Sequence, residues 1–228
     1  MSTINNLFIF SDFDGTITKE DSLNILIDKC MGSEPRQSID DAIKQGTMSF
    51  KEGMTRQFAG IDASWEEAST FLQSTTHVDP HFKEFAQYCD AENIPLTVVS
   101  CGIGPLIKEF LKGFVGSELA SKIQVEANSV EIIDQKWIPV YHDDSDFGHD
   151  KSLTMRQIKA TLEVKPILVF LGDGLSDISA AREADILFAK KGCDLEDWCI
   201  KENVSYTSFE NFSHVLEVLK KFIATREM

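Results

Sequence analysis

The stretch "FIFSDFDGTIT" (residues 8–18) decides how the rest of the chain is interpreted. The preceding apolar run, residues 7–10, has the composition of a buried strand and leads directly into Asp12 and Asp14. Two carboxylates two residues apart repel each other, so both are harder to ionise. A buried strand that only needed a turn would end in neutral residues. The two acids therefore indicate a chemical role.

Six further segments have the composition of strands, and several of them are short and continuously apolar. They are residues 94–100, 122–133, 136–141, 166–172, 185–191 and 204–209. Helical patterns at residues 81–93, 104–116 and 151–163 lie between them, and residues 208–228 end the chain as a packing helix. This alternation predicts an α/β fold: a doubly wound, Rossmann-like parallel sheet with a small β-hairpin.

About 80 residues between the first two predicted strands carry no strand signal and are predicted as several short helices. Two of these begin with capping boxes, at Ser49-x-x-Glu52 and Ser64-x-x-Glu67. A crossover between parallel strands needs only a dozen or so residues. We therefore interpret residues 17–79 as a helical cap inserted into a core of residues 1–16 and 80–228. The alternative is a crossover elaborated only for stability.

Composition limits the partners of this chain. The 228 residues carry a formal net charge of −15, which argues against nucleic acid or an anionic membrane as a partner. An anionic substrate would need a local cation or oriented amides. The five cysteines show no metal-binding spacing, and the sequence has no targeting pattern and no apolar stretch long enough to span a bilayer. We expect a soluble, cytoplasmic protein. The sequence leaves its oligomeric state open.

Polar side chains follow the strands at the edge where parallel α/β sheets bind ligands. They are carboxylates and one hydroxyl with two following amides, and an amine stands at the start of the helix that precedes the strand at 166–172. These candidate site residues are Asp12 and Asp14, Ser100, Cys101 and Gly102, Lys151, and Asp173 and Asp177.

This set can hydrolyse a phosphate ester. Asp12 could attack phosphorus and form an aspartyl-phosphate. Asp14 could protonate the leaving oxygen and then deprotonate water, which requires the two acids to differ in protonation. Ser100 and the next two amides could hold phosphate oxygens, while Lys151 stabilises the phosphoryl group. We predict Mg²⁺ as the cation that offsets the clustered carboxylates.

The motifs "DFDGT", "VVSCG", the lysine of "FGHDK" and "GDGLSD" resemble, in order and spacing, those of haloacid-dehalogenase-like phosphatases. The resemblance covers about residues 7–190. The inserted helices are similar to the phosphoserine-phosphatase branch, and "FGHDK" with "GDGLSD" to its subgroup of methionine-salvage and fungal polyol-phosphate phosphatases. The resemblance implies Mg²⁺ ligands: the Asp12 and Asp173 side chains, the Asp14 carbonyl, and Asp177 directly or through water. The alternative role of Asp177 is to cap the following helix, and the two roles could coexist.

Two cap positions bear on the substrate. In phosphoserine phosphatases the resemblance implies a cap glutamate and an arginine that binds the substrate carboxylate. The matching residues are Asp21 and Gln57, and Arg56 lies one residue away. Glutamine cannot pair with a carboxylate as arginine does. We therefore predict a small phosphorylated metabolite rich in hydroxyls, a polyol or sugar phosphate. The alternatives are phosphoserine, if the helix shifts Arg56 inward, and an enol phosphate of methionine salvage.

Other classes fit less well. Dehalogenases lack an acid at the position of Asp14, and P-type ion pumps carry threonine there. Receiver modules of signalling proteins combine Asp, Mg²⁺ and Lys, but they are about half as long and have no insertion between their first two strands. A catalytically silent phosphate-binding or scaffold protein is the non-enzyme alternative, although no motif residue is missing.

Overall fold

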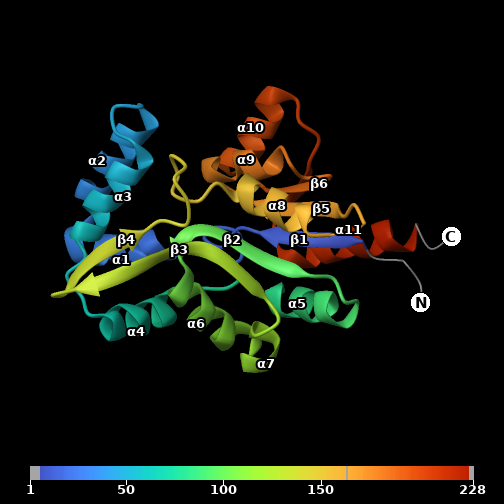
Figure 1. Cartoon of the computed structure of the whole chain (residues 1–228), viewed down its shortest axis with the longest axis horizontal. Helices are drawn as coiled ribbons and strands as arrows, with labels where there is room; N and C mark the ends of the chain where they lie inside the picture. The colour runs from blue at the N-terminus through green and yellow to red at the C-terminus, as the bar shows by residue number, and fades with distance from the viewer. Residues whose placement is uncertain (1–5, 163, 226–228) are drawn as a thin grey trace.

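The computed structural model describes residues 6–162 and 164–225. It contains one seven-stranded sheet in the order β4-β3-β2-β1-β5-β6-β7, in which only β4 runs antiparallel to its neighbour (Figure 1). The strands are β1 (Leu7–Ser11), β2 (Leu96–Ile103), β3 (Gln124–Ile133), β4 (Lys136–Val140), β5 (Ile167–Gly172), β6 (Ile186–Lys190) and β7 (Thr207–Phe209). All seven predicted strands form, and the predicted doubly wound α/β fold is confirmed.

Helices cover both faces of the sheet. On one face lie α5 (Phe82–Ala91), α6 (Gly104–Val115), α7 (Ser117–Ala120) and α11 (Phe212–Ala224); on the other lie α8 (Lys151–Ala160), α9 (Ile178–Ala181) and α10 (Asp194–Glu202) (Figure 1). Successive β1 residues serve the two faces, because Ile9 belongs to one buried apolar cluster and Phe10 to the other. Burial on both faces explains why these strands are continuously apolar. The predicted ends of two helices, at 163 and at 226–228, lie outside the described residues.

Between β1 and α5 the described chain forms four helices: α1 (Ser22–Met31), α2 (Ser33–Lys44), α3 (Phe50–Ala59) and α4 (Trp65–Thr75). The capping box predicted at Ser64 is complete. At Ser49 only half of the predicted box forms: its side chain accepts from the amide of Glu52, whose carboxylate pairs with Arg56 instead.

The β3–β4 hairpin and the loop after it pack against these inserted helices. The Trp137 indole donates to the carbonyl of Ala63 at 2.7 Å, and the Tyr141 hydroxyl donates to the carbonyl of Lys51 at 2.8 Å. Phe147, in the loop that leads to α8, contacts Phe50 with ring centroids 5.5 Å apart. The inserted helices are therefore attached to the segment that precedes Lys151.

Within residues 6–162 and 164–225, no helix is both long enough and apolar enough to cross a lipid bilayer.

Candidate active site

The site lies at the carboxyl ends of the three central strands, β2, β1 and β5. Their adjacent, parallel pairing brings Asp12, Ser100 and Asp173 to one edge of the sheet although they are far apart in sequence. The structure thereby brings together the four predicted strand-end motifs.

Lys151 is fully buried between two carboxylates. Its Nζ lies 2.5 Å from Asp12 Oδ1 and 2.5 Å from Asp177 Oδ1. Burial alone would lower the pKa of Lys151, but the charges of the two aspartates raise it well above its ordinary value. Lys151 is the first residue of α8, and Asp150 caps that helix by accepting from the amide of Ser152. The lysine is therefore charged and fixed against Asp12.

Asp12, Asp173 and Asp177 form an acidic cluster, in which one carboxylate oxygen from each lies within 4.8 Å of the others. Burial and the charge of Asp177 raise the pKa of Asp12 to about 6, although Lys151 opposes this shift. Burial and the charges of Asp12 and Asp177 raise the pKa of Asp173 to about 9. Within the described residues, Lys151 is the only cation hydrogen-bonded to these carboxylates. Three hard oxygen donors with excess negative charge fit a divalent cation such as Mg²⁺.

Asp177 does not cap the helix that follows it. Its Oδ2 accepts from the amides of Asp173 and Gly174, each at 2.9 Å, and its Oδ1 accepts from Lys151. The carboxylate is turned back toward the end of β5, and α9 has no side-chain cap bond. The capping alternative is therefore wrong.

Asp14 has a different environment from Asp12. Its Oδ1 accepts from the amide of Ser22 at 2.7 Å and from the Ser22 hydroxyl at 2.6 Å. Burial and the charge of Asp21 raise the pKa of Asp14 to about 8, against the effect of the Ser22 bonds. Asp14 thus keeps a proton at a pH where Asp12 has lost its own. The sequence analysis missed Ser22, because nothing in the sequence indicates that α1 begins beside Asp14.

Ser100, Cys101 and Gly102 lie in an irregular strand end. We expected the strand to stop at residue 100, but β2 continues to Ile103 with a register shift against β3 after Ser100. Gly102 donates its amide to Ser100 Oγ at 2.9 Å. A β-carbon at Gly102 would lie 2.9 Å from Asp14 Oδ2, so glycine allows this loop to approach the first motif. The bulge aims the loop at Asp14.

The three residues of the inserted helices that bear on the substrate, Asp21, Gln57 and Arg56, differ in their contacts and exposure. Asp21 caps α1 by accepting from the amide of Asn24. Gln57 is buried, and its amide donates to Asp40 Oδ1 at 2.7 Å. Arg56 has a side chain that is 57% exposed and pairs with Glu52 across one helical turn. The inward shift of Arg56 that we kept as an alternative is not found, because adjacent residues point about 100° apart on a helix.

An unforeseen arginine lies beside Gln57. The guanidinium of Arg36 donates to both carboxylate oxygens of Asp28, at 2.5 and 3.2 Å, and to Asp40 Oδ2 at 2.6 Å. Desolvation raises the pKa of the Asp21 carboxyl although the residue as a whole is exposed, while the charge of Arg36 lowers this pKa and that of Asp40 raises it. We call Asp21, Asp28, Arg36, Asp40 and Gln57 the cap network. It comes from three different helices and an N-cap, so no local pattern reveals it.

Residues 9–182 match the haloacid dehalogenase-like hydrolases as a family. The chain belongs to this family. The predicted resemblance is confirmed.

Curated relatives of this hydrolase extend over nearly its whole length. It is 39% identical over 224 residues to Pdp3-interacting factor 1 of Schizosaccharomyces pombe, covering 97% of this chain and 98% of the relative. It is 38% identical over 225 residues to polyol phosphate phosphatase PYP1 of Saccharomyces cerevisiae, covering 95% and 93%. It is 28% identical to a 2-hydroxy-3-keto-5-methylthiopentenyl-1-phosphate phosphatase of Bacillus cereus, covering 96% and 98%. This hydrolase is a phosphatase.

Solved structures agree on the fold. A phosphoserine phosphatase solved as a phospho-aspartyl intermediate analogue superposes with a TM-score of 0.71 at 17% identity, covering 94% of this chain and 98% of that one. A substrate-bound phosphoserine phosphatase gives a TM-score of 0.72 at 16% identity, covering 95% and 99%. At such low identity these similarities support the architecture of the hydrolase and leave its substrate open.

Proposed function

We propose that this phosphatase hydrolyses the phosphomonoester of a small, hydroxyl-rich metabolite, a polyol or sugar phosphate, through an aspartyl-phosphate on Asp12. The observation that carries the proposal is the buried Lys151, whose ammonium group holds Asp12 at 2.5 Å beside Asp177. This contact orients the Asp12 carboxylate at the strand end and supplies the positive charge that an anionic substrate needs in so acidic a chain.

The reaction uses the two acids in turn. Asp12 attacks phosphorus, the bond from phosphorus to the ester oxygen breaks, and Asp14 gives its proton to the departing alcohol. Asp14 then takes a proton from water as that water attacks the phosphorus of the aspartyl-phosphate. Inorganic phosphate leaves and the Asp12 carboxylate is restored. Ser22 orients Asp14 for both steps through its two hydrogen bonds.

The remaining strand-end groups bind the phosphoryl oxygens. Ser100 Oγ and the amide of Cys101 donate to them, the Gly102 amide exchanges its bond to Ser100 Oγ for a bond to a phosphoryl oxygen, and Lys151 neutralises part of their charge. The Cys101 thiol takes no part as a nucleophile, because burial raises its pKa to about 12.

The acidic cluster would hold Mg²⁺ through Asp12, Asp173 and Asp177, together with the Asp14 carbonyl that the family resemblance implies. When bound, Mg²⁺ would offset the negative charge of the carboxylates and of the transferred phosphoryl group.

The enzyme works on small metabolites in the cytoplasm. Residues 17–79 act as a cap over a core of residues 1–16 and 80–228. A helical cap encloses the leaving group and excludes water and polymers.

The cap network supports a leaving group without a carboxylate. Arg36 already pairs with both oxygens of Asp28 and with Asp40, so its guanidinium is not offered to a substrate anion. Asp21 and Asp40 can accept hydrogen bonds from hydroxyls. The relative named as a polyol phosphate phosphatase, at 38% identity, supports the same substrate class.

The test compares kcat/KM for glycerol, erythritol, arabitol and ribitol phosphates with the values for phosphoserine and an enol phosphate. We expect at least one polyol phosphate to exceed phosphoserine by about 100-fold or more, the cost of two unmatched charge-assisted hydrogen bonds. A higher value for phosphoserine would overturn the substrate proposal, and a higher value for the enol phosphate would favour methionine salvage.

A pair of variants on α2 tests the cap network directly. Asp40→Asn should lower kcat/KM for the best polyol phosphate by about tenfold, the value of one charge-assisted hydrogen bond, and leave p-nitrophenyl phosphate unaffected. Asp41→Asn is the matched control, because Asp41 is the exposed neighbour on the same helix. Equal effects of Asp40→Asn on both substrates would contradict a role in recognising the leaving group.

A further inference from the structure

His149 is a fully buried histidine to which the proposed reaction gives no role. Its side chain lies between β2 and α8, with Nδ1 2.9 Å from the carbonyl oxygen of Ser100 and Nε2 2.8 Å from Thr154 Oγ1.

The two partners define one form of the ring. A carbonyl oxygen can only accept a hydrogen bond, so Nδ1 carries the proton and donates to Ser100. Nε2 then accepts from the Thr154 hydroxyl. Burial lowers the pKa of His149 to about 4, although the Ser100 bond opposes this shift. The neutral ring therefore satisfies both bonds.

The ring connects two parts of the phosphate site. Ser100 begins the irregular segment of β2 whose hydroxyl and amides are proposed to bind the phosphate. Thr154 lies on the first turn of α8, three residues after Lys151 and on the same face of the helix. The His149 side chain thus links the main chain of Ser100 to the first turn of α8, the turn that carries Lys151.

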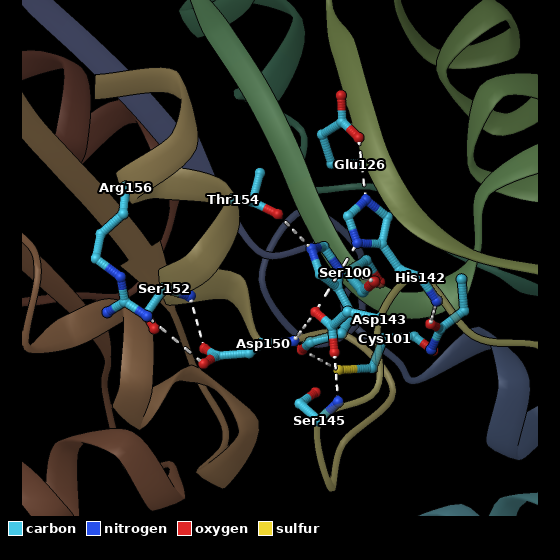
Figure 2. Close-up of polar contacts among 12 residues, drawn as sticks. Ser100, Cys101, Glu126, His142, Asp143, Ser145, Asp150, Ser152, Thr154 and Arg156 are labelled. Carbon is cyan, nitrogen blue, oxygen red and sulfur yellow. Dashed lines mark hydrogen bonds and ion pairs between the residues drawn. The ribbon is translucent and has the colours of Figure 1, made fainter. Parts of the chain in front are cut away.

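The surroundings hold the ring in place. His142 packs on it with ring centroids 4.1 Å apart, and Asp143 accepts from the amides of Ser145 and Asp150 at 2.8 Å each (Figure 2). These contacts close the loop before α8 around His149. On the other side, the Cys101 thiol donates weakly to the His149 carbonyl at 3.8 Å.

We propose that His149 is a positioning residue that sets the Ser100 loop relative to Lys151 and thereby tunes phosphate affinity without touching the substrate. The inference rests on the proposed function in one respect, that Ser100 and Lys151 bind the phosphoryl group.

The test replaces His149 by asparagine or glutamine, because the side-chain amide of each can take the place of one ring nitrogen. In His149→Asn the side-chain amide can occupy the place of Nδ1 and donate to Ser100, whereas His149→Gln reaches toward Thr154 and loses the Ser100 bond. The readout is the Kd of inorganic phosphate with Mg²⁺ present, measured by calorimetry, together with Tm. We expect Asn to stay within about threefold of wild type, and Gln and Ala to weaken binding about tenfold, the value of one hydrogen bond. The matched control is His214→Asn, at an exposed histidine of α11.

A purely structural role would give phosphate affinities that follow Tm, without rescue by Asn. Asn binding as weakly as Gln, or unchanged binding in Gln and Ala, would overturn the proposal. If the variants do not fold, nitrogen-15 NMR of the wild type decides: the Nδ1–H tautomer is expected, and an Nε2–H tautomer at His149 would refute it. Because calorimetry needs no turnover, failure of aspartyl-phosphate chemistry in Asp12→Asn is a separate result.

Discussion

Replacing Asp12 by Asn should abolish turnover and, in the absence of metal, make the fold more stable. Asp12 and Asp177 are buried and Asp173 beside them is half-buried, and the pKa of Asp12 rises from 3.8 to about 6 because of burial and the charge of Asp177. Above pH 6 the ionised carboxylate therefore lowers the free energy of unfolding by at most about 3 kcal/mol, since each pKa unit corresponds to about 1.4 kcal/mol. Asparagine removes that charge and keeps an oxygen that can accept from Lys151.

The sign depends on pH in a defined way. Because the folded pKa of Asp12 lies above its unfolded value, the destabilisation is absent below the ordinary pKa of 3.8 and develops as the pH rises through about 6. Thermal unfolding in EDTA at about pH 7.5 should show a Tm for Asp12→Asn up to roughly 10 °C above wild type, from roughly 2–4 °C per kcal/mol for a chain of this size. The difference should disappear near pH 4.

Three outcomes would refute this reasoning. Asp12→Asn could be less stable than wild type in EDTA, which would mean that the Lys151 ion pair outweighs burial and repulsion. The Tm difference could be independent of pH. Finally, the variant could keep more than about a tenth of the wild-type rate on p-nitrophenyl phosphate, which would exclude Asp12 as the nucleophile. Asp41→Asn, at an exposed site, is the control for the loss of one surface charge.

Further predictions concern the acid, the metal and the buried histidine. Asp14→Asn should lower kcat about 100-fold or more, because general acid–base transfer is lost; full activity would exclude this role. Because burial and the charge of Asp21 raise the pKa of Asp14 to about 8, the substitution should raise Tm near neutral pH in EDTA, as Asp12→Asn does. Turnover should require Mg²⁺, stop in EDTA and fall with excess Ca²⁺, whose longer and looser coordination misaligns the attack; equal rates with both ions would contradict the acidic site. Burial, with the nearby charges of His142 and Lys151 and against that of Asp143, lowers the pKa of His149 from 6.5 to about 4. The unfolded state therefore binds the proton first as the pH falls. Urea unfolding should show the free energy of unfolding of the wild type decreasing by up to about 3 kcal/mol as the pH falls from 6.5 to about 4. His149→Asn should lack that decrease, and equal pH dependence of the two proteins would refute the reasoning.

The sequence alone predicted the core of the fold and the chemistry at the strand ends. Strands buried on both faces must be continuously apolar, so the local sequence is enough to predict where they lie. The carboxyl ends of neighbouring parallel strands must share one edge, so the motifs that follow them could be placed together without coordinates. Asp12, Ser100 and Asp173 were found in this way, and Lys151 was found at the start of the helix that precedes β5. The helices between β1 and β2 were predicted for the same kind of local reason, from capping residues and helical periodicity.

Tertiary packing alone decided which side chains complete the site. Gln57 and Arg56 are neighbours, and only the packing of α3 determines that Gln57 is buried while Arg56 is exposed. Arg36 is paired with acids on its own and a neighbouring helix, and His149 joins Ser100 to Thr154 across two elements. Apolar patterns report whether a position is buried, but hydrogen bonds between distant segments depend on distances of a few tenths of an ångström and on donor direction. Those quantities exist only once the strands and helices have packed.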